Sequence, residues 1–148
     1  MWFSRKQGAV EKAQTVPGQV TTKSRGDAAE SAALAFLIRG GLKFVEANYR
    51  TPGRGGGEID LIMRAPDGTL VFVEVRQRSG NSHGGAAASI SSTKQRRIIF
   101  AARHYLLRFA SAPPCRFDVV LVQGAPGTAA QAGADPRIEW LVAAFDAS

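Results

Sequence analysis

The sequence predicts an α/β domain with a mixed central sheet of about five strands flanked by helices. Two observations predict it. Apolar residues recur at helical spacing in two stretches, and elsewhere they alternate with polar residues as in strands. The expected order is one helix, three strands, a second helix and two strands. A helix inserted between strands favours a sheet with both parallel and antiparallel neighbours.

The first helix is expected to begin at Asp27, because Glu30 follows three residues later as in a capping box. It should end at the Gly40–Gly41 pair, since glycine favours helix termination. The preceding residues, 1–25, are basic and show little apolar periodicity, and we interpret them as a flexible arm. Residues 26–148 then form a single domain, in keeping with a total length of 148 residues.

The remaining elements follow from the same patterns. Period-two alternation predicts the strands, and a helical apolar stripe that stops at a Pro-Pro pair predicts the second helix. Segments rich in glycine separate several of these elements and should be loops. The expected strands are 42–49, 58–64, 70–78, 117–122 and 138–145, and the expected helix is about 91–110.

Composition restricts the classes of function. The net charge is +7 at pH 7, which favours phosphate-rich or other anionic partners. No apolar run approaches the roughly 20 residues of a membrane span, and the N-terminus lacks the apolar stretch of a secretory signal. We therefore expect a cytoplasmic protein that does not bind membranes. The single cysteine excludes a disulfide within the chain.

The strands 58–64 and 70–78 should form a hairpin whose register follows from their apolar pattern. A three-residue loop at 66–68, with Gly68 at positive φ, puts the apolar sets of both strands on one face. A two-residue turn would put Asp60 on the valine face instead. The favoured register gives the cross-strand pairs Ile62–Phe72, Asp60–Glu74 and Glu58–Arg76.

This register brings two carboxylates together. Asp60 and Glu74 would face each other at roughly 5 Å between Cβ atoms, which destabilises a sheet unless something offsets the repulsion. Mg²⁺ or Mn²⁺ would offset it, with the backbone carbonyl of Val75 and water as further oxygen ligands. Arg76 points to the same face and could hold a phosphate or a developing charge. The alternative is that both acids are solvated on an open face, balanced by Arg76 and Arg78.

The apolar neighbours Ile62 and Phe72 favour a covered face over an open one, because they share the side of the hairpin that carries Asp60 and Glu74.

The motifs of the chain resemble a known family. The run GEIDLIMRAPDGTLVFVEVRQR, with GDAAESAALAFLIRGG before it and SSTKQRRIIFAARHYL and RFDVVLV after it, resembles the YraN family of small bacterial proteins. The similarity covers about residues 24–145. It implies a restriction-endonuclease-like fold related to archaeal Holliday-junction resolvases.

The resemblance also implies a nuclease site. In that superfamily an acid on one strand, here Asp60, precedes a D/E-x-K triplet on the next, here Glu74 with Arg76 in the place of the lysine. Glu30 matches an additional acid on the first helix, and Lys94 is a candidate auxiliary cation. The implied activity is metal-dependent hydrolysis of DNA, with branched DNA as a candidate substrate. Arginine stays charged and binds phosphate as a planar fork, so transition-state stabilisation suits position 76 better than general-base catalysis.

A basic stretch supports a nucleic-acid partner. No acid occurs between Glu74 and Asp118, whereas arginines and lysines are frequent there. Lys94 and Arg97 share a helix face and could contact one phosphate path. The residues we expect to bind nucleic acid are Arg54, Arg78, Lys94 and Arg97.

Several alternatives remain open from the sequence alone. The chain could be a nucleic-acid-binding module with a vestigial site, as Arg76 suggests, or an adaptor that acts through its basic arm. A resolvase-like enzyme that cuts two strands would be expected to form a homodimer. Asp118 could assist the site or form a structural ion pair with an arginine. The loop 80–89 could fold over substrate or be a passive connector, and His83 and His104 are expected to be ordinary polar residues.

Overall fold

The computed structural model describes residues 22–78, 90–123 and 137–147. Its elements are α2 (Thr22–Arg39), β1 (Lys43–Arg50), β2 (Glu58–Arg64), β3 (Leu70–Arg78), α4 (Ser92–Leu106), β4 (Cys115–Gln123) and β5 (Arg137–Phe145). The strands form one five-stranded sheet in the order β1-β2-β3-β4-β5. Only β3 and β4 are parallel, and α4 connects them. The predicted α/β class, the mixed sheet and the order of elements are confirmed.

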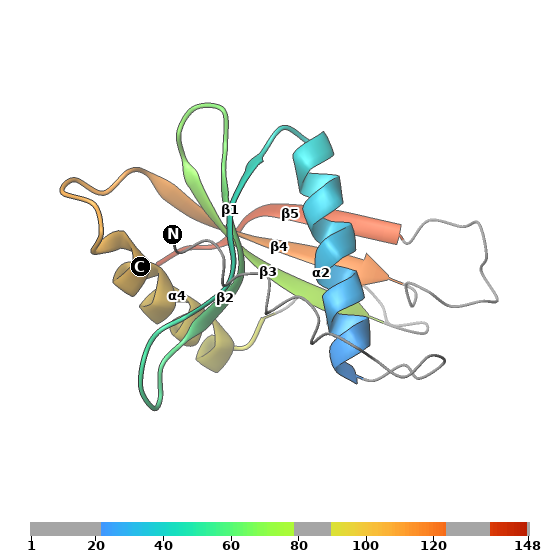
Figure 1. Cartoon of the computed structure of the whole chain (residues 1–148), viewed down its shortest axis with the longest axis horizontal. Coiled ribbons are helices and arrows are strands. Elements are labelled where there is room, and N and C mark those ends of the chain that lie inside the picture. Colours follow the sequence, from blue (N-terminus) through green and yellow to red (C-terminus); the bar gives the residue numbers. More distant parts are fainter. Residues whose placement is uncertain (1–21, 79–89, 124–136, 148) are drawn as a thin grey trace, which may run out of the picture.

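The two helices cover opposite faces of the sheet (Figure 1). α2 places Ala29, Ala33 and Leu37, spaced by four residues, in the core on one face. The other face, which includes Ile62 and Phe72, packs against α4. The buried residues of α4 are Ile98, Ala101, Ala102 and Tyr105. The prediction that another element covers Ile62 and Phe72 is therefore confirmed.

The predicted start of the first helix is wrong. α2 already begins at Thr22, so Asp27 and Glu30 lie inside it and form no capping box. Helix stability in proteins comes mainly from packing of one face, and the contacts of α2 with the sheet outweigh the local capping signal. Residues 22–25, which we expected in the basic arm, are thus helical, and residues 1–21 lie outside the described part of the chain.

The second helix is shorter than predicted at its C-terminus. It begins after Ser91, whose side chain accepts a hydrogen bond from the amide of Lys94 (3.1 Å). After Leu106 the chain tightens into bonds between amides and carbonyls three residues apart, at Leu107 and Phe109. The helix therefore stops before residue 110.

The hairpin of β2 and β3 has the predicted register only near its turn. Ile62 pairs with Phe72, and Gly68 in the connecting loop has φ 95°. The ladder ends, however, at the pair Leu61–Val73. Contrary to the prediction, Asp60–Glu74 and Glu58–Arg76 are therefore not backbone pairs, although the side chains of Asp60 and Glu74 do meet. On its other side β2 pairs Glu58 with Arg50 of β1.

Each strand follows its outer neighbour beyond that point. β2 stays paired with β1 as far as Glu58, and β3 stays paired with β4 as far as Arg78. The two central strands therefore separate after Leu61 and Val73. We call this point the fork.

Among the helices of the described residues, none combines the length and the apolar character needed to cross a membrane.

Candidate functional site

Asp60 and Glu74 lie immediately beyond the fork, one on each separating strand. Asp60 accepts a hydrogen bond from the backbone amide of Val75 through Oδ2 (2.8 Å). The Asp60 carboxylate thus takes the place of a β2 backbone carbonyl as the acceptor for this β3 amide, and it links the two strands where their ladder has ended.

The two carboxyl groups are hydrogen-bonded to each other. Glu74 is only 7% exposed. Burial first, and then the negative charge of Asp60, raise the pKa of Glu74 from its ordinary value of 4.5 to about 8. Burial also raises the pKa of Asp60, against the opposing effects of the Val75 amide and Lys94. At neutral pH Glu74 therefore holds a proton that it donates to Asp60.

Lys94 is the cation of this site. Its Nζ lies 3.5 Å from Oε2 of Glu74, and its side chain is 34% exposed. The Ser91 cap fixes the start of α4 and so places Lys94 over the fork. The predicted auxiliary cation and the predicted acid pair are thus brought together.

The donor set suits a hard divalent cation. The two carboxyl groups share a proton because burial and their mutual repulsion oppose ionising both, and a cation would replace that proton. Within residues 22–78, 90–123 and 137–147, no three His, Cys, Asp or Glu side chains gather as a metal-binding group. A metal would therefore depend on Asp60, Glu74, backbone oxygen and water, which is a set that Mg²⁺ accepts. Val75 is seen to use its amide, and a role for its carbonyl stays a prediction.

A pocket of about 210 Å³ adjoins Asp60. Its lining residues are Asp27, Glu30, Asn48, Arg50, Glu58, Ile59 and Asp60. Burial, then the charges of Asp60 and Asp27, raise the pKa of Glu30. Glu30 therefore shares the pocket and the electrostatic field of Asp60, but it does not complete a three-carboxylate group.

Asn48 is a site residue that the sequence reasoning missed. It lies in β1 with φ 54°, in the left-handed region, and its side chain forms a hydrogen bond with Glu30. Asn tolerates this conformation better than most residues. An Asn inside the predicted strand KFVEANYR was the available signal, since Asn is uncommon within strands.

The other predicted residues are more scattered. Arg76 is partly buried on β3 beside Leu121 of β4. Arg54 is exposed in the loop between β1 and β2, and Arg97 is exposed on α4. That loop meets α4 at Gly57, where a Cβ would overlap the carbonyl of Arg97. Arg78 ends β3, but its side chain lies outside the described residues.

Three further predictions concern the surroundings of the site. His104 is bonded to the hydroxyl of Tyr49 (Nδ1 to Oη, 2.6 Å), away from the fork, as an ordinary polar residue. His83 and the loop 80–89 lie outside the described residues.

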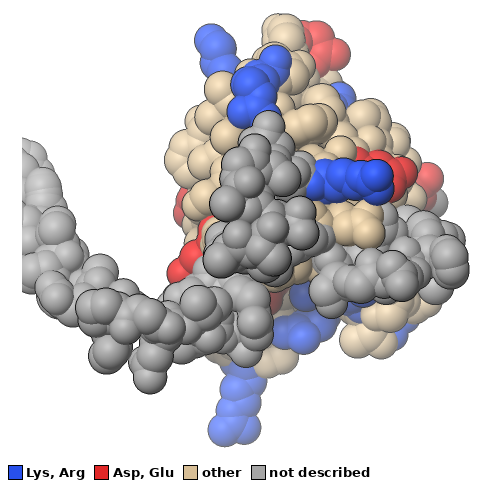
Figure 2. Space-filling view, turned by 90° about the vertical axis from the view of Figure 1, so that its right-hand side faces the viewer, with Lys and Arg blue, Asp and Glu red and all other residues tan. Residues whose placement is uncertain are grey.

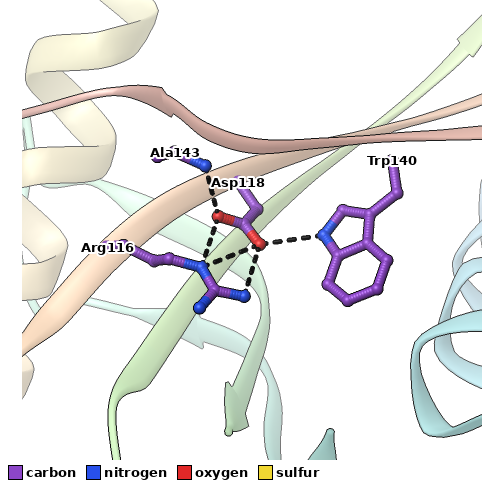
Figure 3. A network of polar contacts seen from close by, with 4 residues as sticks. All are labelled: Arg116, Asp118, Trp140 and Ala143. Carbon is purple, nitrogen blue, oxygen red and sulfur yellow. Dashed lines mark hydrogen bonds and ion pairs between the residues drawn. The ribbon is translucent and has the colours of Figure 1, made fainter. Parts of the chain in front are cut away.

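Asp118 belongs to a separate network and not to the fork (Figure 3). It is fully buried and accepts hydrogen bonds from Arg116 Nε (3.0 Å), Trp140 Nε1 (2.8 Å) and the amide of Ala143 (2.9 Å). The structural ion pair is therefore confirmed as its role.

Comparison with known proteins identifies the family. The model of the Uncharacterised protein family UPF0102 matches residues 29–122. The chain belongs to this family. UPF0102 and YraN are the same family, so the predicted resemblance is confirmed.

Relatives match over nearly the whole length. A UPF0102 protein of Polaromonas sp. (strain JS666) is 74% identical over 151 residues, covering 100% of both chains. One of Polaromonas naphthalenivorans is 69% identical over 157 residues, again covering 100% of both. One of Albidiferax ferrireducens is 65% identical over 127 residues, 86% of this chain and 91% of the relative. These matches establish kinship, and the chemistry must be argued from the site.

Proposed function

We propose that this UPF0102 protein is a metal-dependent endonuclease that hydrolyses phosphodiester bonds in DNA, with Mg²⁺ or Mn²⁺ as the cofactor. The observation that carries the proposal is the buried carboxyl pair at the fork. Asp60 and Glu74 share a proton beside Lys94, and burying this second acid beside the first carries a free-energy cost that a bound cation would offset. A restriction-endonuclease-like fold, which the order of elements suits, provides such a fork for catalysis.

The roles follow from the contacts. Asp60 and Glu74 would hold the metal, which when bound supplies Lewis-acid stabilisation of a phosphate oxygen and lowers the pKa of water. The Val75 amide orients Asp60 by donating to one of its two oxygens and leaves the other for a ligand. Lys94 would move from Glu74 to a substrate phosphate once the metal neutralises the pair. Arg76 would stabilise charge on the phosphate.

The substrate class follows from charge. Lys94 and Arg97 occupy the first turns of α4, and Arg54 lies in the adjoining loop, so a polyanion that crosses the fork beside α4 would meet several cations. Such residues contact the backbone and not the bases, which suits recognition by shape. Branched DNA is the first substrate to test.

Cleavage assays with purified full-length protein test the proposal. Wild type should cut branched or linear DNA with Mg²⁺ or Mn²⁺ and not with EDTA. Asp60→Asn and Glu74→Gln should each reduce the rate at least about 100-fold, because each removes a metal ligand. The control is Asp67→Asn, an exposed acid at the turn of the same hairpin, which should cut at the wild-type rate. Cutting that survives both fork variants would show a contaminating nuclease or another site.

A second candidate is a nucleic-acid-binding module without catalysis. Arg76 favours it, since an arginine stands where the nuclease signature has lysine. This candidate predicts salt-dependent DNA binding that Asp60→Asn leaves intact, with no cutting under any metal. The homodimer expected of a resolvase-like enzyme is tested by the mass of the protein in light scattering, alone and with DNA.

A further inference from the structure

α4 presents an unusual surface to solvent. Its outward positions follow the spacing four, three, four, which keeps them on one face opposite the buried residues of the helix. They form what we call the α4 stripe: Arg96, Phe100, Arg103 and Leu107. Phe100 is 53% exposed and Leu107 is 78% exposed, although both are large apolar side chains.

The α4 stripe combines exposed apolar side chains with positive charge. Arg96 and Arg103 flank Phe100 at one turn on either side, and both are exposed. Among the described residues Arg103 has no carboxylate within ion-pair distance, and Arg96 donates a hydrogen bond to the uncharged hydroxyl of Thr93 (3.4 Å). On the side of the molecule turned away from α4, basic side chains instead stand at separate points with acidic ones among them (Figure 2).

An aromatic ring between arginines fits one chemical class of partner. Every nucleobase has a face that can stack on an exposed ring, and the phosphates on either side of that base suit flanking guanidinium groups. Duplex DNA keeps its bases stacked on one another and offers no free face to a side chain on the surface. The stripe is about 16 Å long, roughly the axial length of five stacked nucleotides.

We propose that the α4 stripe binds unpaired nucleotides of a nucleic-acid strand, with Phe100 stacked on a base and Arg96 and Arg103 on the phosphates beside it. The proposal rests on the proposed function in one respect, namely that the partner is nucleic acid. It adds that the preferred substrate has a single-stranded segment. α4 also carries Lys94 at its N-terminal end, so a strand bound along the helix would lead towards the fork.

Binding measured in EDTA separates this proposal from catalysis. The probes are a fluorescein-labelled 20-nucleotide oligo(dT) and a 20-base-pair duplex, titrated with full-length protein and followed by anisotropy. Phe100→Ala should weaken oligo(dT) binding about tenfold and duplex binding less than about twofold. Phe100→Trp should retain binding, because its ring also stacks.

The matched control is Phe44→Ala. Phe44 is 47% exposed but lies in β1, outside the stripe, and its removal should leave both affinities unchanged. Because Phe100 is half exposed, the melting temperature of Phe100→Ala should equal that of wild type, so that a weaker complex reflects lost contact.

Three outcomes would overturn the proposal. They are a wild type that does not bind oligo(dT), a Phe100→Ala variant that loses affinity for oligo(dT) and the duplex equally, and a Phe100→Ala variant that binds oligo(dT) with the wild-type affinity. A Phe100→Ala variant that binds as wild type but loses self-association in light scattering would identify a second copy of the chain as the occupant. If Phe100→Ala selectively loses oligo(dT) while no DNA is cut by wild type, the stripe stands and the nuclease proposal fails. If wild type cuts DNA but Phe100→Ala binds oligo(dT) as tightly as wild type, the nuclease proposal stands and the stripe proposal fails.

Discussion

Two buried acids on neighbouring strands have opposite surroundings. Asp118 of β4 is fully buried and receives donors from a guanidinium, an indole and a backbone amide. Glu74 of β3 lies one register step away and is 7% exposed, but it meets another acid and one ammonium at 3.5 Å. The protein thus provides Asp118 with several hydrogen-bond donors, whereas Glu74 has few.

The difference separates a structural acid from the acid that we propose as a metal ligand. A buried acid with full donors stabilises the strands that supply them, here β4 and β5. A buried acid without such donors destabilises the folded state while no ligand is bound. Binding of a cation would remove that cost. Four predictions test this contrast, in order of decreasing effect.

Asp118→Asn should produce the largest loss of stability. The substitution removes a fully buried charge and leaves the Arg116 guanidinium, which is 27% exposed, without its counter-charge, so the free energy of unfolding should fall by about 3 kcal/mol. Urea denaturation measures it. The control is Glu139→Gln, an exposed acid of β5, which should change stability by less than about 0.5 kcal/mol. Equal effects of both variants would contradict a special role for the Asp118 network.

Glu74→Gln should raise stability at alkaline pH. Because the pKa of Glu74 is raised from 4.5 to about 8, the folded state binds more protons than the unfolded state between these values. Wild-type stability should therefore fall as pH rises from about 4.5 to about 8, and the variant should lack much of this fall. At pH 9 it should exceed wild type by roughly 1–3 kcal/mol in urea denaturation. A variant less stable than wild type at pH 9 would contradict the shortage of donors at Glu74.

Mg²⁺ should stabilise wild type at pH 8, where it can displace the shared proton. At a free concentration ten times its dissociation constant, binding to the folded state adds about 1.4 kcal/mol to the free energy of unfolding. Asp60→Asn should abolish the increase, whereas Asp118 variants that remain folded should keep it. Thermal unfolding with Mg²⁺, or with Na⁺ at the same ionic strength, provides the measurement. An equal response to both salts would argue against a metal site.

Asn48→Ala should give the smallest effect. A left-handed backbone at φ 54° costs an alanine about 1 kcal/mol more than a glycine, so Asn48→Gly should be the more stable of the two variants. Both variants lose the hydrogen bond to Glu30, so the difference between their free energies of unfolding reports the cost of the left-handed backbone alone. If the two variants unfold at the same urea concentration, the conformation of β1 at this residue is not strained.

The sequence predicts local features well and the fork not at all. Alternating apolar residues and the Gly68 turn are enough for the register near the turn, because that register depends only on the hairpin itself. The end of the ladder depends instead on β1 and β4, which lie outside the hairpin and draw its strands apart. Asp60 and Glu74 are thus identified correctly as neighbours, but for a reason other than direct cross-strand pairing.

The same distinction explains the other differences. The start of α2 at Thr22 depends on packing against a sheet that forms from later residues. The left-handed conformation of Asn48 likewise occurs where β1 pairs with β2, a strand that follows later in the chain. By contrast, the ion pair of Asp118 with Arg116 joins residues two apart on one strand, and the sequence offers it as an alternative.

The turn at 66–68 lies at the far end of the hairpin from the fork, but it determines which residues stand there. Lengthening it by one residue would slide β2 along β3 and bring a different side chain of β2 opposite the Val75 amide. The number of residues in this turn therefore helps to align the two acids of the candidate site, so an insertion here should disturb that site more than an insertion in a surface loop that sets no strand register.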